Sequence, residues 1–200
     1  MLGTPTRDRV AERRAATRKE ILDAAWDVAR EQGLSQITLR DVADRVGMRP
    51  PSLYSHFDSK NAIYDAMFAQ AWTECHEAML AAGRSRVRTP RAKLRLYART
   101  FFAFAVSDLA RHQLMNQRTI PGFEPTAEAY APAVAALELH RERLREIGVT
   151  KEQDVDLCVS LVGGLIDAQL ANDPGGNRWG RLVDRTADMF ADNVGLPHDK

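Results

Sequence analysis

The sequence predicts an all-α protein. Apolar residues recur at helical spacing through almost the whole chain, and no segment shows the period-two alternation of a half-buried strand. Breaks rich in Gly, Pro or Asn separate the periodic segments, most clearly at residues 116–125 and 172–177. With 200 residues, of which 44% are hydrophobic and 28% charged, the chain is long and apolar enough for a folded core.

Composition excludes several classes of protein. No apolar run approaches the roughly 18 residues of a membrane helix, and the basic first 20 residues lack the apolar core of a secretory signal. We therefore expect a cytoplasmic protein with no membrane partner. Cys75 and Cys158 are far apart, and Cys75 and His76 would diverge on a helix, so neither a disulfide framework nor a metal site is expected. No cofactor is expected either.

Three short helices followed by a longer one are predicted in the N-terminal part. Thr38, with Asp41 three residues later, resembles a capping box, and Gly47 suits the left-handed end of a helix. Three short helices with a tight turn before the third have helix-turn-helix geometry. The predicted helices cover residues 14–31, 38–46, 50–57 and 59–82.

The helix over residues 50–57, of about two turns, has an unusual outer face. If Leu53 and Phe57 face the core, the outward residues are small, hydroxyl-bearing or imidazole, and no acid occurs before Asp58. A face without carboxylates can approach DNA phosphates closely. Candidate phosphate contacts are Thr38, Tyr54, His56 and Lys60, and Arg40 is a candidate reader of guanine. Each also has a structural interpretation, as a helix cap, as packing or as surface polarity.

The motifs of this region resemble the DNA-binding domain of TetR-family transcriptional regulators over about residues 14–65. The resemblance implies phosphate contacts for Tyr54, His56, Lys60 and the helix N-terminus at Thr38. It implies base contacts for Arg40, Arg49, Ser52 and Ser55, and a basic arm formed by Arg13, Arg14 and Arg18 before the first helix. The alternative for that arm is a solvated tail. Pro50, which has no backbone N–H, departs from the polar residue that is frequent there. The matching strings are Ile37-Thr38-Leu39-Arg40-Asp41-Val42-Ala43, Val46-Gly47-Met48, Pro51-Ser52-Leu53-Tyr54-Ser55-His56-Phe57 and Ser59-Lys60.

The middle of the chain predicts a ligand pocket. Helices are expected over residues 91–110 and 126–147, the second kinked or divided by Pro132, with an irregular segment between them. Aromatic residues and Met are abundant here, which suits an adaptable apolar pocket for a small hydrophobic effector. The alternative is that they form ordinary core. The candidate pocket residues are Trp72, Tyr97, Phe101, Phe102, Phe104, Met115, Phe123 and Tyr130.

The last two predicted helices, over residues 150–171 and 179–193, carry apolar stripes. Gly163-Gly164 in mid-helix is costly unless another backbone approaches. The stripes could cover the chain's own core, but the resemblance implies a dimer built on a four-helix bundle. The candidate interface residues are Val155, Val159, Val162, Ile166, Leu182, Met189 and Phe190.

Together these features predict a DNA-binding domain over residues 1–65 and a ligand-binding and dimerisation domain over residues 66–200. We expect a non-enzymatic repressor that binds palindromic double-stranded DNA as a homodimer and is released by its effector. The chain lacks a phosphate-binding glycine loop and the H-E-x-x-H and G-x-S-x-G motifs. The alternative hypothesis is an all-helical small-molecule-binding protein or enzyme that does not bind DNA.

Overall fold

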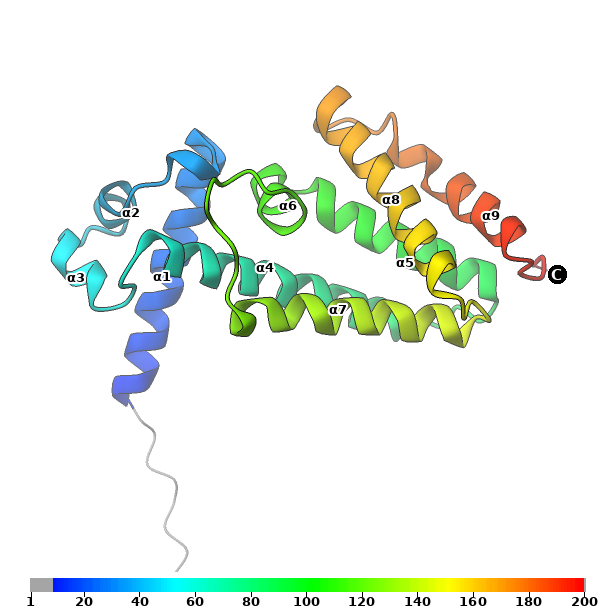
Figure 1. The fold of residues 1–200 in the computed structure, drawn as a ribbon, viewed down its shortest axis with the longest axis horizontal. Helices are drawn as coiled ribbons and strands as arrows, with labels where there is room; N and C mark the ends of the chain where they lie inside the picture. The colour runs from blue at the N-terminus through cyan, green and yellow to red at the C-terminus, as the bar shows by residue number, and fades with distance from the viewer. Residues whose placement is uncertain (1–8, 200) are drawn as a thin grey trace, which may run out of the picture.

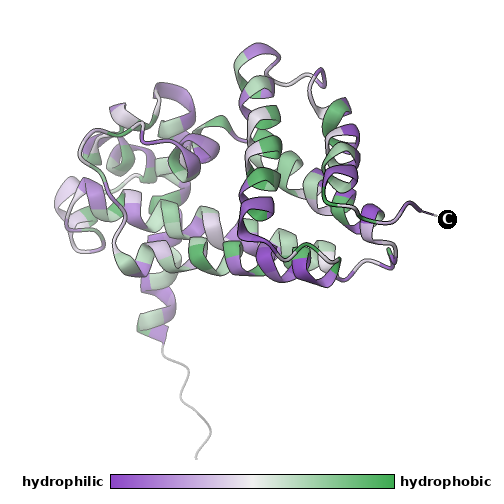
Figure 2. Cartoon of the chain, turned by 45° about the vertical axis from the view of Figure 1, so that its right-hand side comes forward, coloured by the Kyte–Doolittle hydropathy of each residue, from purple (hydrophilic) through white to green (hydrophobic). Residues whose placement is uncertain are grey.

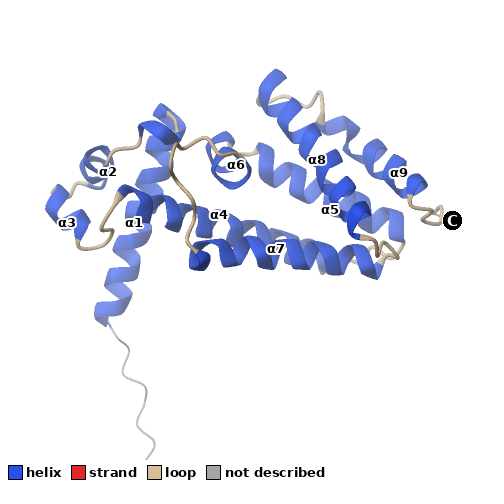
Figure 3. Cartoon of the chain, in the orientation of Figure 1, coloured by secondary structure: helices blue, strands red, loops and turns tan. Residues whose placement is uncertain are grey.

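The computed structural model describes residues 9–199, and this part of the chain contains helices and loops but no strand (Figures 1 and 3). The helices α1, α2 and α3 form a small unit at one end, and α4 leads from it into the rest of the molecule (Figure 1). None of the described helices is long and apolar enough to cross a membrane. The helices are α1 (Arg9–Gln32), α2 (Leu39–Val46), α3 (Pro50–Tyr54), α4 (Lys60–Gly83), α5 (Pro90–Val106), α6 (Leu109–Asn116), α7 (Ala127–Glu146), α8 (Glu152–Asn172) and α9 (Val183–Asn193).

The capping residues start and stop the N-terminal helices as the sequence predicts. The Thr38 hydroxyl oxygen accepts a hydrogen bond from the backbone N–H of Asp41 at 3.1 Å and begins α2. Ser59 caps α4 in the same way through Ala62 at 3.1 Å. Gly47 ends α2 in the left-handed region, with φ of 77°, where a side chain would be strained.

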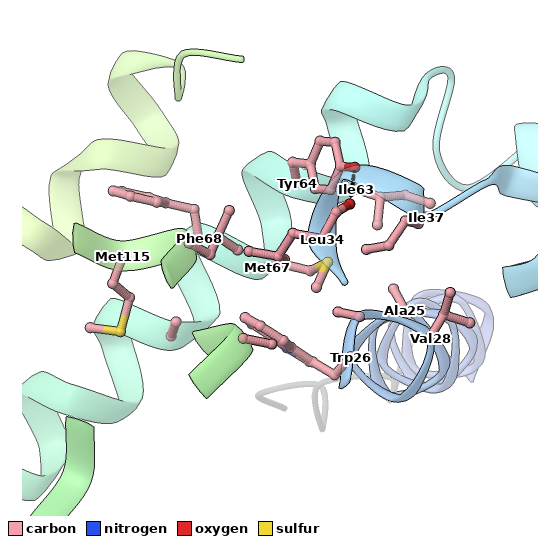
Figure 4. Packing of buried hydrophobic residues seen from close by; sticks show 14 of the residues in the cluster. Ala25, Trp26, Val28, Leu34, Ile37, Ile63, Tyr64, Met67, Phe68 and Met115 are labelled. Carbon is pink, nitrogen blue, oxygen red and sulfur yellow. Dashed lines mark hydrogen bonds between the residues drawn. The ribbon is translucent and has the colours of Figure 1, made fainter. Parts of the chain in front are cut away.

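A buried cluster joins the N-terminal unit to α4 (Figure 4). Trp26 of α1 packs near Met67 of α4, and the hydroxyl of Tyr64 donates a hydrogen bond to the carbonyl of Leu34 at 2.5 Å. The same cluster continues along α4 to Met115 of α6. The first half of α4 is therefore held rigidly against the helix-turn-helix unit.

A second cluster holds the C-terminal helices together. Leu94 and Phe102 of α5 pack with Val162 and Ile166 of α8 and with Phe190 of α9. Hydrophobic and hydrophilic residues alternate along the helices, as expected of elements with one buried face (Figure 2). On the other side of α5, α4 and α7 lie side by side (Figure 1).

Several helix boundaries differ from the sequence-based predictions. The first helix starts at Arg9, so Arg13, Arg14 and Arg18 lie within α1 and not before it. The predicted helix over residues 91–110 is two helices, because the carboxylate of Asp108 accepts the backbone N–H of Arg111 at 3.0 Å and begins α6.

Two further predictions concerned proline-containing helices. The helix α3 has five residues, shorter than the predicted two turns, because the chain turns from Ser55 onward. Conversely, Pro132 does not divide α7, which continues from Ala127 to Glu146. Pro132 is the sixth residue of α7, so it removes one backbone hydrogen bond, that to the carbonyl of Glu128, and the helix continues past it.

Candidate DNA-binding face and ligand cavity

The outer face of α3 is exposed and free of acidic side chains. Leu53 and Phe57 are buried, with 0% and 2% of their surface exposed, whereas Tyr54 is 52% exposed. Ser52 and Ser55 are also exposed, and the Ser55 hydroxyl donates to the Ser52 carbonyl at 2.7 Å. The structure therefore presents a small, hydroxyl-rich surface, as expected from the sequence.

Two arginines flank this surface. Arg40 is in the first turn of α2, and its side chain is 84% exposed, with Asp44 3.8 Å away as its ion-pair partner. Arg49 immediately precedes α3 and is exposed. Both guanidinium groups can reach outward past the small side chains of α3.

The remaining candidate phosphate contacts are partly engaged within the protein. The Thr38 hydroxyl donates to the Asp41 carboxylate at 2.6 Å. Lys60 donates from Nζ to the carbonyl of Ser35 at 3.0 Å. The ring of His56 is half-buried, and its Nδ1 has no hydrogen-bond partner. Of these three, His56 alone has a buried polar atom that is left unpartnered.

Arg14 and Arg18 lie within α1 and turn toward α3, which corrects their placement in an arm before the first helix, while their contact with DNA stays a prediction. Arg14 donates to the carbonyl of Ser55 at 3.1 Å, and Arg18 donates to the carbonyl of His56. The Arg18 guanidinium also lies 4.0 Å from the centroid of the Phe57 ring. Basic side chains near the last carbonyls of a helix stabilise its end. The spacing of four residues between Arg14 and Arg18, on one face of α1, was the available signal for this role.

An apolar cavity of about 140 Å³ lies among α4, α5, α7 and α8. Of the predicted pocket residues, Trp72, Tyr97 and Phe101 line it. Val159 and Val162, which were candidates for the dimer interface, line it as well. The cavity is about the size of one known to bind benzene.

The other five pocket candidates pack elsewhere. Phe102 belongs to the C-terminal cluster, and Met115 to the cluster around α4. The Phe104 ring lies 3.8 Å from the Arg111 guanidinium, and Phe123 and Tyr130 pack on rings of α4. The interpretation of these five as ordinary packing, left open by the sequence, fits the structure.

Sequence reasoning missed several cavity residues, among them Cys75, Leu94 and His140. Burial raises the pKa of the Cys75 and Cys158 thiols to about 12, so both remain protonated and apolar near neutral pH. Burial and the nearby Arg141 lower the pKa of His140, which favours the neutral imidazole. The cavity wall is therefore uncharged.

Four candidate interface residues are buried inside the protomer. Val155, Val162, Ile166 and Phe190 are at most 8% exposed and belong to the C-terminal cluster, so they offer no surface to a partner. Leu182 is half-buried. The exposed apolar residues of α8 and α9 are Leu157 (39%), Val159 (45%), Leu161 (36%) and Met189 (61%). Leu157 and Leu161 were missed because they lie one position before the predicted stripe.

Within residues 9–199, no three Asp, Glu, His or Cys side chains lie close enough together to hold a metal ion.

Solved structures share this fold over most of the chain. The transcriptional regulator FadR from Bacillus subtilis, solved in complex with stearoyl-CoA, superposes with a TM-score of 0.68 over 90% of this chain and 99% of its own, at 19% identity. A protein of unknown function from Rhodococcus sp. RHA1 superposes with a TM-score of 0.77 over 90% of this chain and 95% of its own, also at 19% identity. At such identities the likeness shows the fold.

Sequence similarity is concentrated in the helix-turn-helix unit. The class D tetracycline repressor protein from Escherichia coli is 35% identical over 69 residues, which are 34% of this chain and 32% of the repressor. The match thus spans about a third of that relative's length. The family described as "Bacterial regulatory proteins, tetR family" matches residues 21–67, which include α2, α3 and the start of α4. This N-terminal region of the chain therefore belongs to the tetR family of bacterial regulatory proteins.

Proposed function

We propose that the protein is a dimeric transcriptional regulator that binds DNA through α3 and releases it when a small hydrophobic molecule enters the cavity. The observation that carries the proposal is the exposed, acid-free face of α3 between the exposed Arg40 and Arg49. The similarity to a tetracycline repressor supports action as a repressor. The proposed role is binding without catalysis, in the cytoplasm, where the DNA is.

In this proposal α3 enters the major groove. Arg40 and Arg49 read base edges, since arginine pairs well with guanine. Ser52 and Ser55 allow close approach, and Tyr54 donates its hydroxyl to a phosphate. Because Lys60 is held by the Ser35 carbonyl, we expect it to contribute through its charge near the phosphates.

A five-residue recognition helix offers few contacts, which favours a homodimer on a palindromic operator. Leu157, Leu161 and Met189 give α8 and α9 an exposed apolar surface. A Cβ at Gly163 or Gly164 would meet nothing within 4 Å inside the protomer, so the chain's own packing does not require glycine there. Close approach of a second copy would require it. Two-fold pairing would place the two α3 helices in successive major grooves, roughly 34–36 Å apart.

The helix α4 connects the cavity to the DNA-binding face. Its residues Trp72 and Met79 line the cavity, and its first residue, Lys60, follows α3 by only a short turn. The helix α6 is tied to α1 by Arg30 and Asp108 at 2.8 Å. An effector that displaces α4 would therefore change the angle of α3. The coupling is reciprocal, so DNA must weaken effector binding by the same factor.

The experiment is selection of bound duplexes from a random-sequence pool. We expect enrichment of a pseudo-palindrome with half-sites about 10 base pairs apart, or a multiple of that spacing. The combined Arg40→Ala and Arg49→Ala variant should lose the enrichment, whereas Arg185→Ala, an exposed arginine on α9, should keep it. A pool without enriched sequence would contradict the proposal and favour a helical small-molecule-binding protein that does not act on DNA.

A further inference from the structure

Arginine side chains with unpaired groups lie beyond the end of the cavity farthest from α3. The helices α4 and α7 both run from the DNA-binding unit toward the opposite end of the molecule (Figure 1). Along α4 the cavity residues Trp72, Cys75 and Met79 are followed, four residues later, by Gly83. Along α7, His140 is followed by Arg143 one turn later. Gly83 and Arg143 therefore lie beyond the same end of the cavity.

The guanidinium group of Arg143 packs against Gly83 of α4 at this end of the cavity. A Cβ at position 83 would collide with this guanidinium group, so the Arg143 side chain crosses α4 directly at this glycine. Burial raises the pKa of Tyr97, a residue of the cavity wall; the positive charge of Arg143 opposes this rise, and the negative charge of Glu146 adds to it. The guanidinium group thus acts on the cavity wall itself, although it is outside the apolar lining.

Two buried nitrogens on α7 lack hydrogen-bond partners at this end. They are Nε2 of His140 and Nε of Arg143, three residues apart and so on one face of the helix. Nη1 of Arg143 donates hydrogen bonds to Glu146, at 2.9 Å and 3.2 Å from the two carboxylate oxygens. The Arg143 Nε–H is an unpaired buried donor, which costs free energy, and a ligand that supplies an acceptor recovers it. Nε2 of His140 donates or accepts according to the tautomer of the imidazole.

The loop after Gly83 adds positive charge. Arg84, Arg86 and Arg88 are all exposed, and none has an ion pair among the described residues. Because no ion pair among the described residues neutralises these three charges, this loop attracts anions.

We propose, building on the function proposed above, that the effector is a small amphipathic anion whose apolar tail, of about six carbons, fills the cavity while its oxyanionic head binds at Arg143. The tail length follows from a cavity about the size of a benzene site. The head is a carboxylate, or a phosphate carried on a larger group that reaches the loop arginines. The uncharged cavity wall favours an apolar tail, and Arg143 orients the ligand by binding its anionic head.

The test is isothermal titration calorimetry of the full-length protein with hexanoate, hexanoyl-CoA and hexanol. We expect either anion to bind at least about tenfold more tightly than hexanol. Arg143→Met should remove that difference while leaving hexanol binding unchanged, and Arg143→Lys should restore part of it. Arg145→Met, which alters a more exposed arginine of α7, is the matched control and should behave as the wild type.

Comparison of hexanoate with hexanoyl-CoA distinguishes a free acid from a phosphate-bearing thioester as the natural effector. Tighter binding of hexanoyl-CoA, lost in the combined Arg86→Ala and Arg88→Ala variant, indicates a phosphate-bearing thioester, and tighter binding of hexanoate indicates a free acid. Equal binding of hexanol and the anions, an unchanged ratio in Arg143→Met, or no binding of any compound would overturn the inference. The selected duplex is titrated on the same samples, so intact DNA binding would show that the function proposed above survives such a failure.

Discussion

We predict that Arg18 of α1 stabilises the C-terminal end of the recognition helix α3. It donates to the carbonyl of His56, and its guanidinium lies 4.0 Å from the Phe57 ring centroid. A hydrogen bond to a charged group contributes about 1.5–3 kcal/mol, and a partly exposed cation–π contact about 0.5–1 kcal/mol. Because the Arg18 side chain is only half-buried, we take the lower part of that range, about 2 kcal/mol, for Arg18→Met.

Urea unfolding followed by circular dichroism measures this loss. For a chain of this length, about 2 kcal/mol corresponds to a fall in Tm of about 6 °C. The urea midpoint should fall without a change in slope, and affinity for DNA should fall about tenfold because α3 loses its support. Arg13→Met, which alters an exposed arginine of α1, is the control. If Arg18→Met matches this control in both stability and DNA affinity, the positioning role is refuted.

Three further predictions concern the core, the cavity and the outer face of α8. Tyr64→Phe removes the donor to the Leu34 carbonyl and should lower the free energy of unfolding by about 1–3 kcal/mol, measured by urea unfolding; an unchanged value would mean that water replaces the hydroxyl. His140 has a lowered pKa in the folded state, so the unfolded state takes up its proton first as the pH falls below about 6.5. Wild-type stability should therefore fall more than that of His140→Gln between about pH 7.5 and about pH 5, and parallel curves would contradict this. Leu161→Arg places a charge on the exposed apolar face of α8 and should convert the proposed dimer to a monomer in sedimentation equilibrium; a persistent dimer would place the interface elsewhere.

The local signals in the sequence predicted the N-terminal unit well. Thr38, Gly47 and Ser59 act through bonds to residues a few positions away, so their caps follow from the sequence alone. The inward positions of Leu53 and Phe57 follow from helical periodicity in the same way. Asp108 provides the same kind of signal, and it was overlooked because the apolar pattern continues across the break.

The site residues that were missed depend on contacts between distant segments. His140 lines the cavity because α7 packs beside α4, and Arg14 and Arg18 reach α3 across about 40 residues of sequence. Periodicity gives the buried face of a helix but not the neighbour that covers it. That is why Val155 and Ile166 could be assigned to a buried stripe while the partner of the stripe, the chain's own core, could not.

The most direct test of the central claim is the affinity of the purified protein for its selected duplex and for a scrambled duplex, measured by fluorescence anisotropy over a series of salt concentrations. The account predicts a preference for the selected duplex of at least about a thousandfold. It also predicts a linear fall of log affinity with log salt concentration, with a slope of about −0.9 per phosphate neutralised. The combined Arg40→Ala and Arg49→Ala variant should bind both duplexes equally. Equal affinity of the wild type for both duplexes, unaffected by these two substitutions, would contradict a DNA-reading role for α3.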